Sequence, residues 1–258
     1  MFHLTGYSSS VTLPTNVALA GLVDPALSRA VTSSAYVFAE RLRLYAGIYI
    51  AAGATRARIN SPTLRQVNPP FLRPVNRGAG VLAGFEIPWF GDQPLWLPAQ
   101  EEVAPEVSGD TAVAERATVL LWLSPGIQPV PAGQIITLRG TAAITAVANA
   151  WTLGAITFDQ ALPSRQYAVV GGECIGATVL GFRLAFPNQL YRPGSLGAAA
   201  LTSVIDWRLM TRRMGLWGRF LNTAPPQLEI LCTAADATQE VYLQIVPLSG
   251  QLGSMMGG

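Results

Sequence analysis

The 258-residue sequence contains no lysine, one histidine (His3) and two cysteines (Cys174 and Cys232). These side chains most often act as general bases, amine or thiol nucleophiles and metal ligands near neutral pH. Without them the chain cannot build a P-loop, which needs a lysine, or a zinc site of the usual ligand count, and it has no histidine in its body for a serine-type triad. We therefore expect no catalytic residue, no cofactor and no metal site, and predict that the protein is not an enzyme.

Charge is also scarce. Only 12% of the residues are charged while 50% are apolar, so the charged share is roughly half that of an ordinary soluble domain. Such a chain either sits in a membrane or has much of its surface covered by other subunits. Residues 140–158 carry no charge and are long enough to span a bilayer, but their four threonines favour strands. A large buried subunit interface is the better interpretation.

The two ends of the sequence differ from the middle. Residues 1–33 are predicted to form an N-terminal arm, since their first arginine is Arg29 and their composition is small and mixed. Asp24 followed by Pro25 is typical of a helix start, so a short helix is expected from Pro25 to about Ser33. The first residues lack a basic region followed by a long apolar run, so we expect no secretory signal. A single domain is predicted over 34–249, followed by a flexible tail over 250–258.

From residue 55 onward, short strand-like runs alternate with proline- and glycine-containing turns, with no helical pattern between them. This pattern predicts an all-β protein, an antiparallel β-sandwich or jelly roll with long loops. Residues 40–45 are also interpreted as a strand, 230–246 as a hairpin, and 88–105 as a proline-rich loop anchored by Trp89 and Trp96. The expected strands are 55–60, 64–68, 81–87, 117–123, 134–147, 155–158, 166–171, 177–186, 202–210, 227–233 and 240–246.

Carboxylates are the main catalytic groups that the sequence retains. Four acids between Glu101 and Asp110 share a stretch that we interpret as an exposed loop. Asp159, Glu173 and Asp206 are isolated near the ends of expected strands. Two carboxylates with different pKa values can hydrolyse glycosides, so a carboxylate-only hydrolase remains an alternative.

One segment combines cationic and aromatic side chains. Residues 207–220 interleave four arginines with two tryptophans and a phenylalanine, a composition that suits phosphate contacts and base stacking but is also enriched at protein interfaces. We favour a subunit interface and keep nucleic-acid contact as the alternative. The net charge of +2 indicates no general affinity for nucleic acid. The candidate residues are Trp207, Arg208, Arg212, Arg213, Trp217 and Arg219.

Two residues outside this segment are given structural roles. His3 lies in the expected arm and is interpreted as a mobile or contact residue. Cys174 is interpreted as a small buried apolar side chain, because the only histidine is poorly placed to activate it. The sequence leaves open whether Cys174 and Cys232 pair.

A resemblance to a known family rests on turn-and-strand patterns. The residues that carry it lie at 57–62, 151–152, 156–159, 162–172, 182–187 and 191–194. In these segments the chain resembles the jelly-roll coat proteins of tailless icosahedral viruses and phages, over about half of its length. The resemblance implies an eight-stranded sandwich, self-assembly into a shell and no catalysis.

One departure concerns the arm. Many coat proteins of single-stranded RNA viruses carry a strongly basic N-terminal arm for the genome, whereas residues 1–28 have no basic side chain except His3. This departure fits a shell that is lined by a membrane, or a genome that is loaded by separate machinery.

The leading hypothesis is therefore a structural capsid protein of the virion that assembles with many copies of itself. Other coat proteins, a genome and an internal membrane are further candidate partners, and no small-molecule substrate is expected. The alternative from another class is a carbohydrate- or surface-binding β-sandwich module, with Trp89, Trp96 and Trp122 as sugar platforms.

Overall fold

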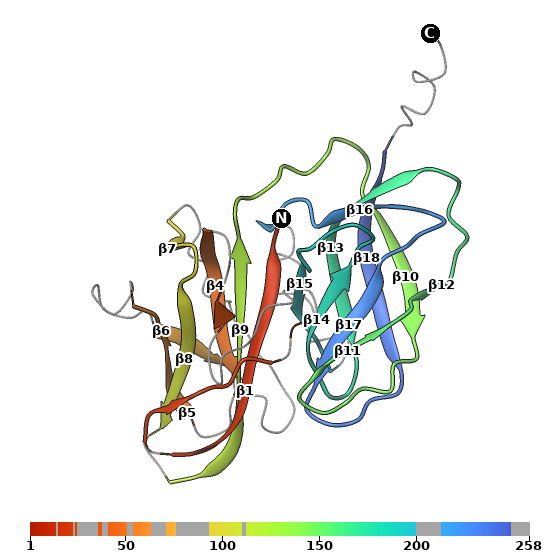
Figure 1. Ribbon diagram of the computed structural model, residues 1–258. Helices are drawn as coiled ribbons and strands as arrows, with labels where there is room; N and C mark the ends of the chain where they lie inside the picture. The colour runs from red at the N-terminus through yellow and green to blue at the C-terminus, as the bar shows by residue number, and fades with distance from the viewer. Residues whose placement is uncertain are drawn as a thin grey trace. The chain divides into compact units, whose positions relative to one another are not determined.

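The computed structural model describes residues 1–13, 15–22, 24, 36–37, 41–50, 54–62, 71–75, 93–109, 112–199 and 213–248. Every regular element of these residues is a β-strand (Figure 1). The chain divides into two compact units, an N-terminal unit over Phe2–Gly126 and a C-terminal unit over Ile127–Gly258, to which Met1 is also assigned. Within the described ranges, no helix is long and apolar enough to cross a membrane.

The N-terminal unit begins with a long strand, β1, and ends with another, β9, and the two pair antiparallel along their whole length. The nine strands of this unit are β1 (His3–Thr12), β2 (Val17–Ala18), β3 (Tyr36–Val37), β4 (Leu42–Ile50), β5 (Ala54–Asn60), β6 (Phe71–Val75), β7 (Leu95–Leu97), β8 (Glu102–Gly109) and β9 (Ala114–Ser124).

The pairing of these strands is that of a jelly roll. The short strand β3, which pairs with β8, is left out of this comparison. The remaining eight strands are counted from first to eighth in chain order. The first, eighth, third and sixth are neighbours in one layer (β1-β9-β4-β7), and the second, seventh, fourth and fifth in the other (β2-β8-β5-β6). Two edge contacts join the layers: β6 runs parallel to β4 at one edge, and Gly21 bridges Tyr7 at the other.

The interior of the N-terminal unit is apolar because alternate residues of each strand point inward. Val103, Pro105 and Val107 of β8 are buried, while Ala104 and Glu106 between them are partly exposed. The phenolic hydroxyl of Tyr7 donates to the carbonyl oxygen of Val103 at 2.9 Å, which ties the two layers together. The stretch from Glu101 to Asp110 was predicted to be an exposed loop. That prediction is wrong for residues 102–109, because the acids alternate with apolar residues that face the core.

The C-terminal unit repeats this topology with its own strands. The first, eighth, third and sixth principal strands form the layer β10-β18-β13-β16, and the second, seventh, fourth and fifth form β11-β17-β14-β15. The short strand β12 adds to the edge of β10. These strands are β10 (Ile136–Ala142), β11 (Trp151–Gly154), β12 (Thr157–Phe158), β13 (Gln166–Ile175), β14 (Val179–Ala185), β15 (Gly194–Leu196), β16 (Gly218–Leu221), β17 (Gln227–Cys232) and β18 (Gln239–Pro247).

Large aromatic side chains fill the space between the layers of the C-terminal unit. The ring centroids of Phe182 and Trp217 lie 6.1 Å apart, and both side chains are fully buried. Gly172 leaves room for them: a Cβ at this position would lie 3.2 Å from the Leu243 side chain and 3.4 Å from the Trp217 ring. A glycine in a central strand is explained here by the close approach of these neighbouring side chains.

The structure confirms the all-β, antiparallel sandwich of jelly-roll type. It divides the chain differently from the predicted single domain over 34–249, since two jelly rolls follow each other. It also places residues 3–12 in a paired strand, where the sequence predicted an arm over 1–33. The helix expected from Pro25 to Ser33 and the tail over 250–258 lie outside the described residues.

Two further predictions changed. The expected hairpin over 230–246 is wrong, because β17 and β18 belong to different layers and the loop between them crosses from one to the other. The proline-rich loop over 88–105 contains strand β7 and the start of β8 in its described part. The strands predicted at 64–68, 81–87 and 202–210 fall outside the described residues.

Candidate interaction sites

The arginine- and tryptophan-rich segment does not form one surface. Trp217 is fully buried in the C-terminal unit, between the layers, so it cannot contact a partner. Arg213 and Arg219 are exposed on either side of it. Trp207, Arg208 and Arg212 lie outside the described residues. The exposed arginines alone remain candidates from this segment for an interface or for nucleic acid.

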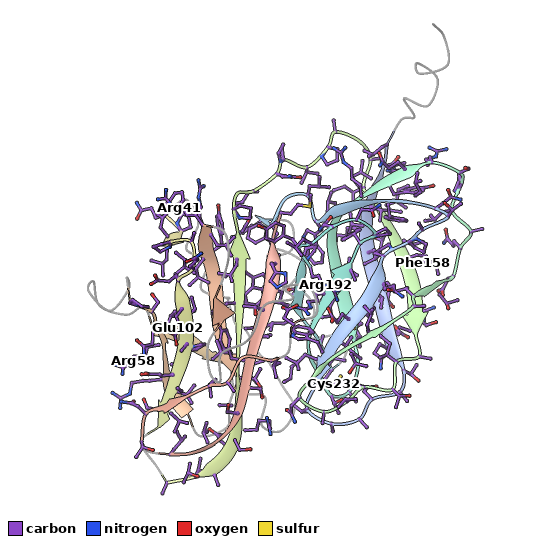
Figure 2. The ribbon with its side chains drawn as sticks, viewed as in Figure 1. Arg41, Arg58, Glu102, Phe158, Arg192 and Cys232 are labelled. Atoms are coloured by element: carbon purple, nitrogen blue, oxygen red, sulfur yellow. The ribbon has the colours of Figure 1, made fainter. Side chains whose placement is uncertain are left out.

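Trp96 is the exposed tryptophan of strand β7, and two arginines cover its ring. The guanidinium carbons of Arg41 and Arg43 lie 4.2 and 4.0 Å from the ring centroid, the geometry of cation–π contacts. Arg41 lies at the surface in Figure 2. Trp122, the second proposed sugar platform, is fully buried, and Trp89 is outside the described residues. A sugar that stacks on Trp96 would have to compete with these two guanidinium groups for the ring.

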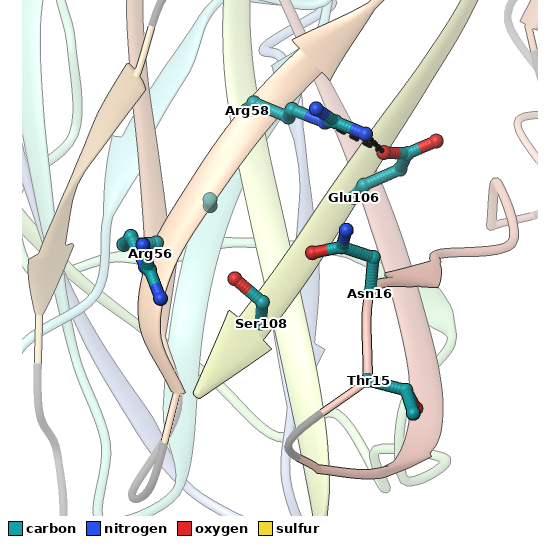
Figure 3. A pocket seen from close by; sticks show the side chains of 7 residues that line it. Thr15, Asn16, Arg56, Arg58, Glu106 and Ser108 are labelled. Carbon is teal, nitrogen blue, oxygen red and sulfur yellow. Dashed lines mark hydrogen bonds and ion pairs between the residues drawn. The ribbon is translucent and has the colours of Figure 1, made fainter. Parts of the chain in front are cut away.

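A polar hollow of about 440 Å³ lies on the outer face of β5 and β8 (Figure 3). We call it the basic hollow, and its lining includes Arg56, Arg58, Glu106, Ser108 and Asn16. Arg56 is the register partner of Ser108, and Arg58 that of Glu106, so the two arginines point outward from successive rows of the sheet.

Within the basic hollow, Arg58 is held in place by its neighbours. Its Nε donates to Glu106 at 2.7 Å and its second terminal nitrogen lies 2.6 Å from the same oxygen. Asn60 donates to the other oxygen of Glu106 at 2.7 Å. The Arg58 side chain is 42% exposed, so it is oriented and still reachable. Two arginines and one carboxylate are among the residues that line the hollow.

On the outer face of β10 and β18 in the C-terminal unit, carboxylates outnumber arginines. We call it the acidic strand face: Arg139 bonds to Asp159 at 2.8 Å and to Glu240 at 3.0 Å, and Tyr242 donates to Glu240 at 2.9 Å. Hydrogen bonds from Tyr242 and Arg139 lower the pKa of Glu240, so this carboxyl is ionised near neutral pH. Two carboxylates against one arginine leave one net negative charge, and all three ions are more than one-third exposed.

A second set of ions is buried in the same unit. Arg183 of β14 and Glu229 of β17 are register partners, with their side chains bonded at 2.5 Å and fully buried. Arg192 donates to the same Glu229 oxygen at 2.6 Å, and the Arg183 guanidinium stacks 4.1 Å from the Trp151 ring centroid. Glu229 thus pairs with two arginines, and the burial of this cluster leaves little of it for a ligand.

Exposed apolar side chains are concentrated in one segment of the C-terminal unit. Ile127, Val130, Ile135 and Ile136 each have between 42% and 47% of their surface exposed. Single exposed apolar residues are ordinary on protein surfaces, but these four lie within ten residues of each other in the sequence. We call residues 127–136 the apolar segment.

The remaining predicted groups are structural in their described parts. His3 was interpreted as a mobile or contact residue, but it is buried and its Nε2 lies 2.9 Å from Asp24. Cys174 and Cys232 are both buried, and they do not form a disulfide with each other. Glu173 is buried in β13, and Asp206 lies outside the described residues. In the described ranges, no three His, Cys, Asp or Glu side chains are grouped so as to hold a metal ion.

Sequence reasoning missed the basic hollow and the acidic strand face. Arg56 and Arg58 alternate with apolar residues at period two, which does indicate one outward face of a strand. Glu106 and Ser108 follow the same alternation in β8. What the sequence could not supply is the pairing of these two strands, which lie about 50 residues apart.

Comparisons with known proteins were made at the level of sequence families, curated proteins and solved structures. No protein-family model matches the chain, and no curated protein matches it. Among solved structures, the chain is similar to the major capsid protein P2 from bacteriophage PM2, with 12% sequence identity and a TM-score of 0.26. That alignment covers 98% of this chain and 100% of the phage protein.

Proposed function

We propose that this chain is a structural, non-enzymatic subunit of a virus shell that assembles with many copies of itself into an icosahedral particle. The observation that carries the proposal is the jelly-roll topology, which occurs twice in one chain. Viral capsid domains and lectin domains are both built on this fold. The resemblance of the sequence to jelly-roll coat proteins supports the first of these two classes.

The apolar segment supports self-association. Four large aliphatic side chains within ten residues are left partly exposed, in a chain whose charged share is already low. Covering them against another copy would remove apolar surface from water at roughly 25 cal/mol per Å². In a shell each copy has many neighbours, so such surface is buried on assembly.

The described tryptophans do not favour the lectin-like alternative. Sugar-binding platforms need accessible aromatic rings, whereas Trp122 is buried and the Trp96 ring already stacks with two arginines. The carboxylates give no better support for a hydrolase, because Asp159 is engaged with Arg139 in an exposed ion pair. A structural role accounts for these groups without a chemical step.

The test is the assembly state of the purified chain. We expect light scattering to show large particles and electron microscopy to show closed shells. Replacing Val130 and Ile135 by Gln should reduce assembly while leaving the melting temperature within a few degrees, because both side chains are exposed. Val147→Gln with Leu190→Gln, at exposed apolar positions outside this segment, is the matched control. A monomer at high concentration with no particles, for the unaltered protein, would overturn the proposal.

A further inference from the structure

Arg41, Arg43 and Trp96 lie together where strand β4 begins and strand β7 pairs with it. Leu42 and Leu44 of β4 are buried, whereas Arg41 is exposed and Arg43 is partly exposed, so the two arginines lie on the outward face of the strand. Trp96 of β7 is the register partner of Arg43, and its side chain is 44% exposed. We call these three residues the Trp96 cluster.

The two guanidinium groups of the Trp96 cluster rest against an aromatic ring and not against carboxylates. Their central carbons lie 4.2 Å (Arg41) and 4.0 Å (Arg43) from the ring centroid. Among the described residues, neither guanidinium has an ion-pair partner or a hydrogen-bond acceptor, and the Nε of Arg43 is buried. Two positive charges within roughly 8 Å of each other repel. An anion bound by both would relieve this repulsion and accept hydrogen bonds from their terminal N–H groups.

We propose that the Trp96 cluster binds the phosphate groups of a single-stranded nucleic acid. Guanidinium groups are planar and permanently charged, and they can donate two parallel hydrogen bonds to one phosphate. The bases of a single strand can stack on guanidinium or aromatic planes, and the cluster has both. This binding goes beyond self-association. In the proposed shell the bound strand would be the packaged genome, and only that identification rests on the proposed function.

The residues around Trp96 favour nucleic acid over a lipid surface or a protein partner. Lipid surfaces and the cores of protein interfaces bury apolar side chains. In the described parts of β4 and β7, Trp96 is the one large apolar side chain that is exposed, while Leu42, Leu44 and Leu97 beside it are buried. A strand of nucleic acid needs cations for its phosphates and does not need a wide apolar surface.

The dependence of binding on salt tests the proposal. Fluorescence anisotropy of a labelled single-stranded oligonucleotide, titrated with the purified chain at several salt concentrations, measures the affinity. Arg41→Gln with Arg43→Gln should lower the affinity by at least about tenfold, because two charged hydrogen-bond donors are lost. The slope of log affinity against log salt concentration should become shallower by about 1.4, since each phosphate contacted on a single strand contributes about 0.7.

Two control variants locate the effect. Arg116→Gln with Arg165→Gln removes the same charge at exposed positions elsewhere and should leave the affinity and the slope nearly unchanged. Trp96→Phe keeps an aromatic ring for the arginines but removes the indole. The change in tryptophan fluorescence on binding should therefore shrink while the affinity is kept, a result that a purely structural Trp96 would not give. Circular dichroism checks that each variant is folded.

Several outcomes would overturn the proposal. They are an unaltered chain that binds no oligonucleotide, an Arg41/Arg43 variant that binds as well as the unaltered chain, and equal weakening in the Arg116/Arg165 variant. Vesicles that contain phosphatidylglycerol present the same phosphodiester chemistry. If the Arg41/Arg43 variant loses binding to the vesicles but not to the oligonucleotide, the ligand is a lipid surface and the proposal is wrong.

The result for nucleic acid is independent of the result for assembly. Electron microscopy of the same preparations shows whether shells form. A chain that forms shells without binding the oligonucleotide keeps the proposed function and overturns this inference. A chain that binds the oligonucleotide through the Trp96 cluster without forming shells does the reverse.

Discussion

Arg183 and Glu229 face each other across β14 and β17, and they occupy the same place in the C-terminal jelly roll that Arg58 and Glu106 occupy in the N-terminal one. In both units the pair joins the fourth and seventh principal strands as register partners. The pair in the C-terminal unit is fully buried, whereas the side chain of Arg58 is 42% exposed. One chain thus holds a buried and an exposed version of the same contact.

This equivalence predicts different costs for the same substitution. Glu229→Ala leaves Arg183 buried without its carboxylate and should destabilise the protein by about 3–5 kcal/mol. Glu106→Ala breaks the exposed pair and should cost about 0–1 kcal/mol. Urea unfolding followed by tryptophan fluorescence measures both. Equal effects from the two substitutions would contradict the assigned burial of Arg183.

Trp217 should behave as a core residue. Trp217→Ala removes a fully buried side chain that packs on Phe182 and should destabilise the protein by about 3–5 kcal/mol. Arg213→Ala and Arg219→Ala, at exposed positions nearby, should change stability by less than about 0.5 kcal/mol. Calorimetry compares the three variants. A stable Trp217→Ala protein with lost association would restore the original interpretation of this residue as an interface contact.

Gly215 should not tolerate a side chain. Its φ of +69° lies in the left-handed region, and a Cβ would lie 2.1 Å from the carbonyl oxygen of Gln128, which accepts a hydrogen bond from Leu216. We expect Gly215→Ala to cost at least about 1–3 kcal/mol. Gly126→Ala is the matched control, because a Cβ there meets no atom within 4 Å. Thermal melting of the two variants measures the difference in stability between them, and equal melting temperatures would contradict the expected cost at Gly215.

Cys174 should be unreactive in the folded protein. Burial, with smaller contributions from Cys232 and Asp236, raises the pKa of its thiol above the ordinary value of roughly 8.5. The thiol is therefore protonated and shielded, and a thiol reagent should modify it only after unfolding. Rapid modification of Cys174 in the folded chain, located by mass spectrometry, would be the opposite result.

The same raised pKa sets the sign of a pH dependence. Above the ordinary thiol pKa the unfolded chain loses this proton while the folded chain keeps it, so the free energy of unfolding falls as pH rises. The contribution is fully present at neutral pH and declines beyond about pH 8.5. Urea midpoints at neutral and alkaline pH measure the decline, and Cys174→Ala should reduce it. An unchanged decline in that variant would assign the pH dependence to other groups.

Much of the fold class could be predicted from the sequence because strand signals are local. Short strand-like runs bounded by turn residues correctly located strands such as β5, β9 and β17, and no helical pattern was found between them. Residues 102–109 were misinterpreted for a physical reason: partly exposed acids in β8 alternate with buried valines, and the acids dominated the composition. The acidic composition reflects only the more exposed face of β8, whereas the alternation of acids with apolar residues indicates both faces of the strand.

The candidate surfaces were less predictable. The arginine–tryptophan segment was chosen because its residues are neighbours in sequence, yet Trp217 points into the core while the exposed arginines flank it. The arginines of the basic hollow lie on β5 beside Ser108 and Glu106 of the distant strand β8. In the acidic strand face, Asp159 follows β12 whereas Glu240 lies in β18. Their proximity depends on strand pairing, which no local pattern encodes.

The sequence by itself determined that the protein is all-β, that its charge is low, and that the usual groups for lysine, histidine or cysteine chemistry are scarce. Those properties depend on composition and on contacts between near neighbours. Only the tertiary structure decided that two jelly rolls follow each other where one was expected, because each unit is closed by long-range pairing, of β1 with β9 and of β10 with β18. Such pairing depends on which apolar faces bury each other, and the two units share it without visible repetition in their residues.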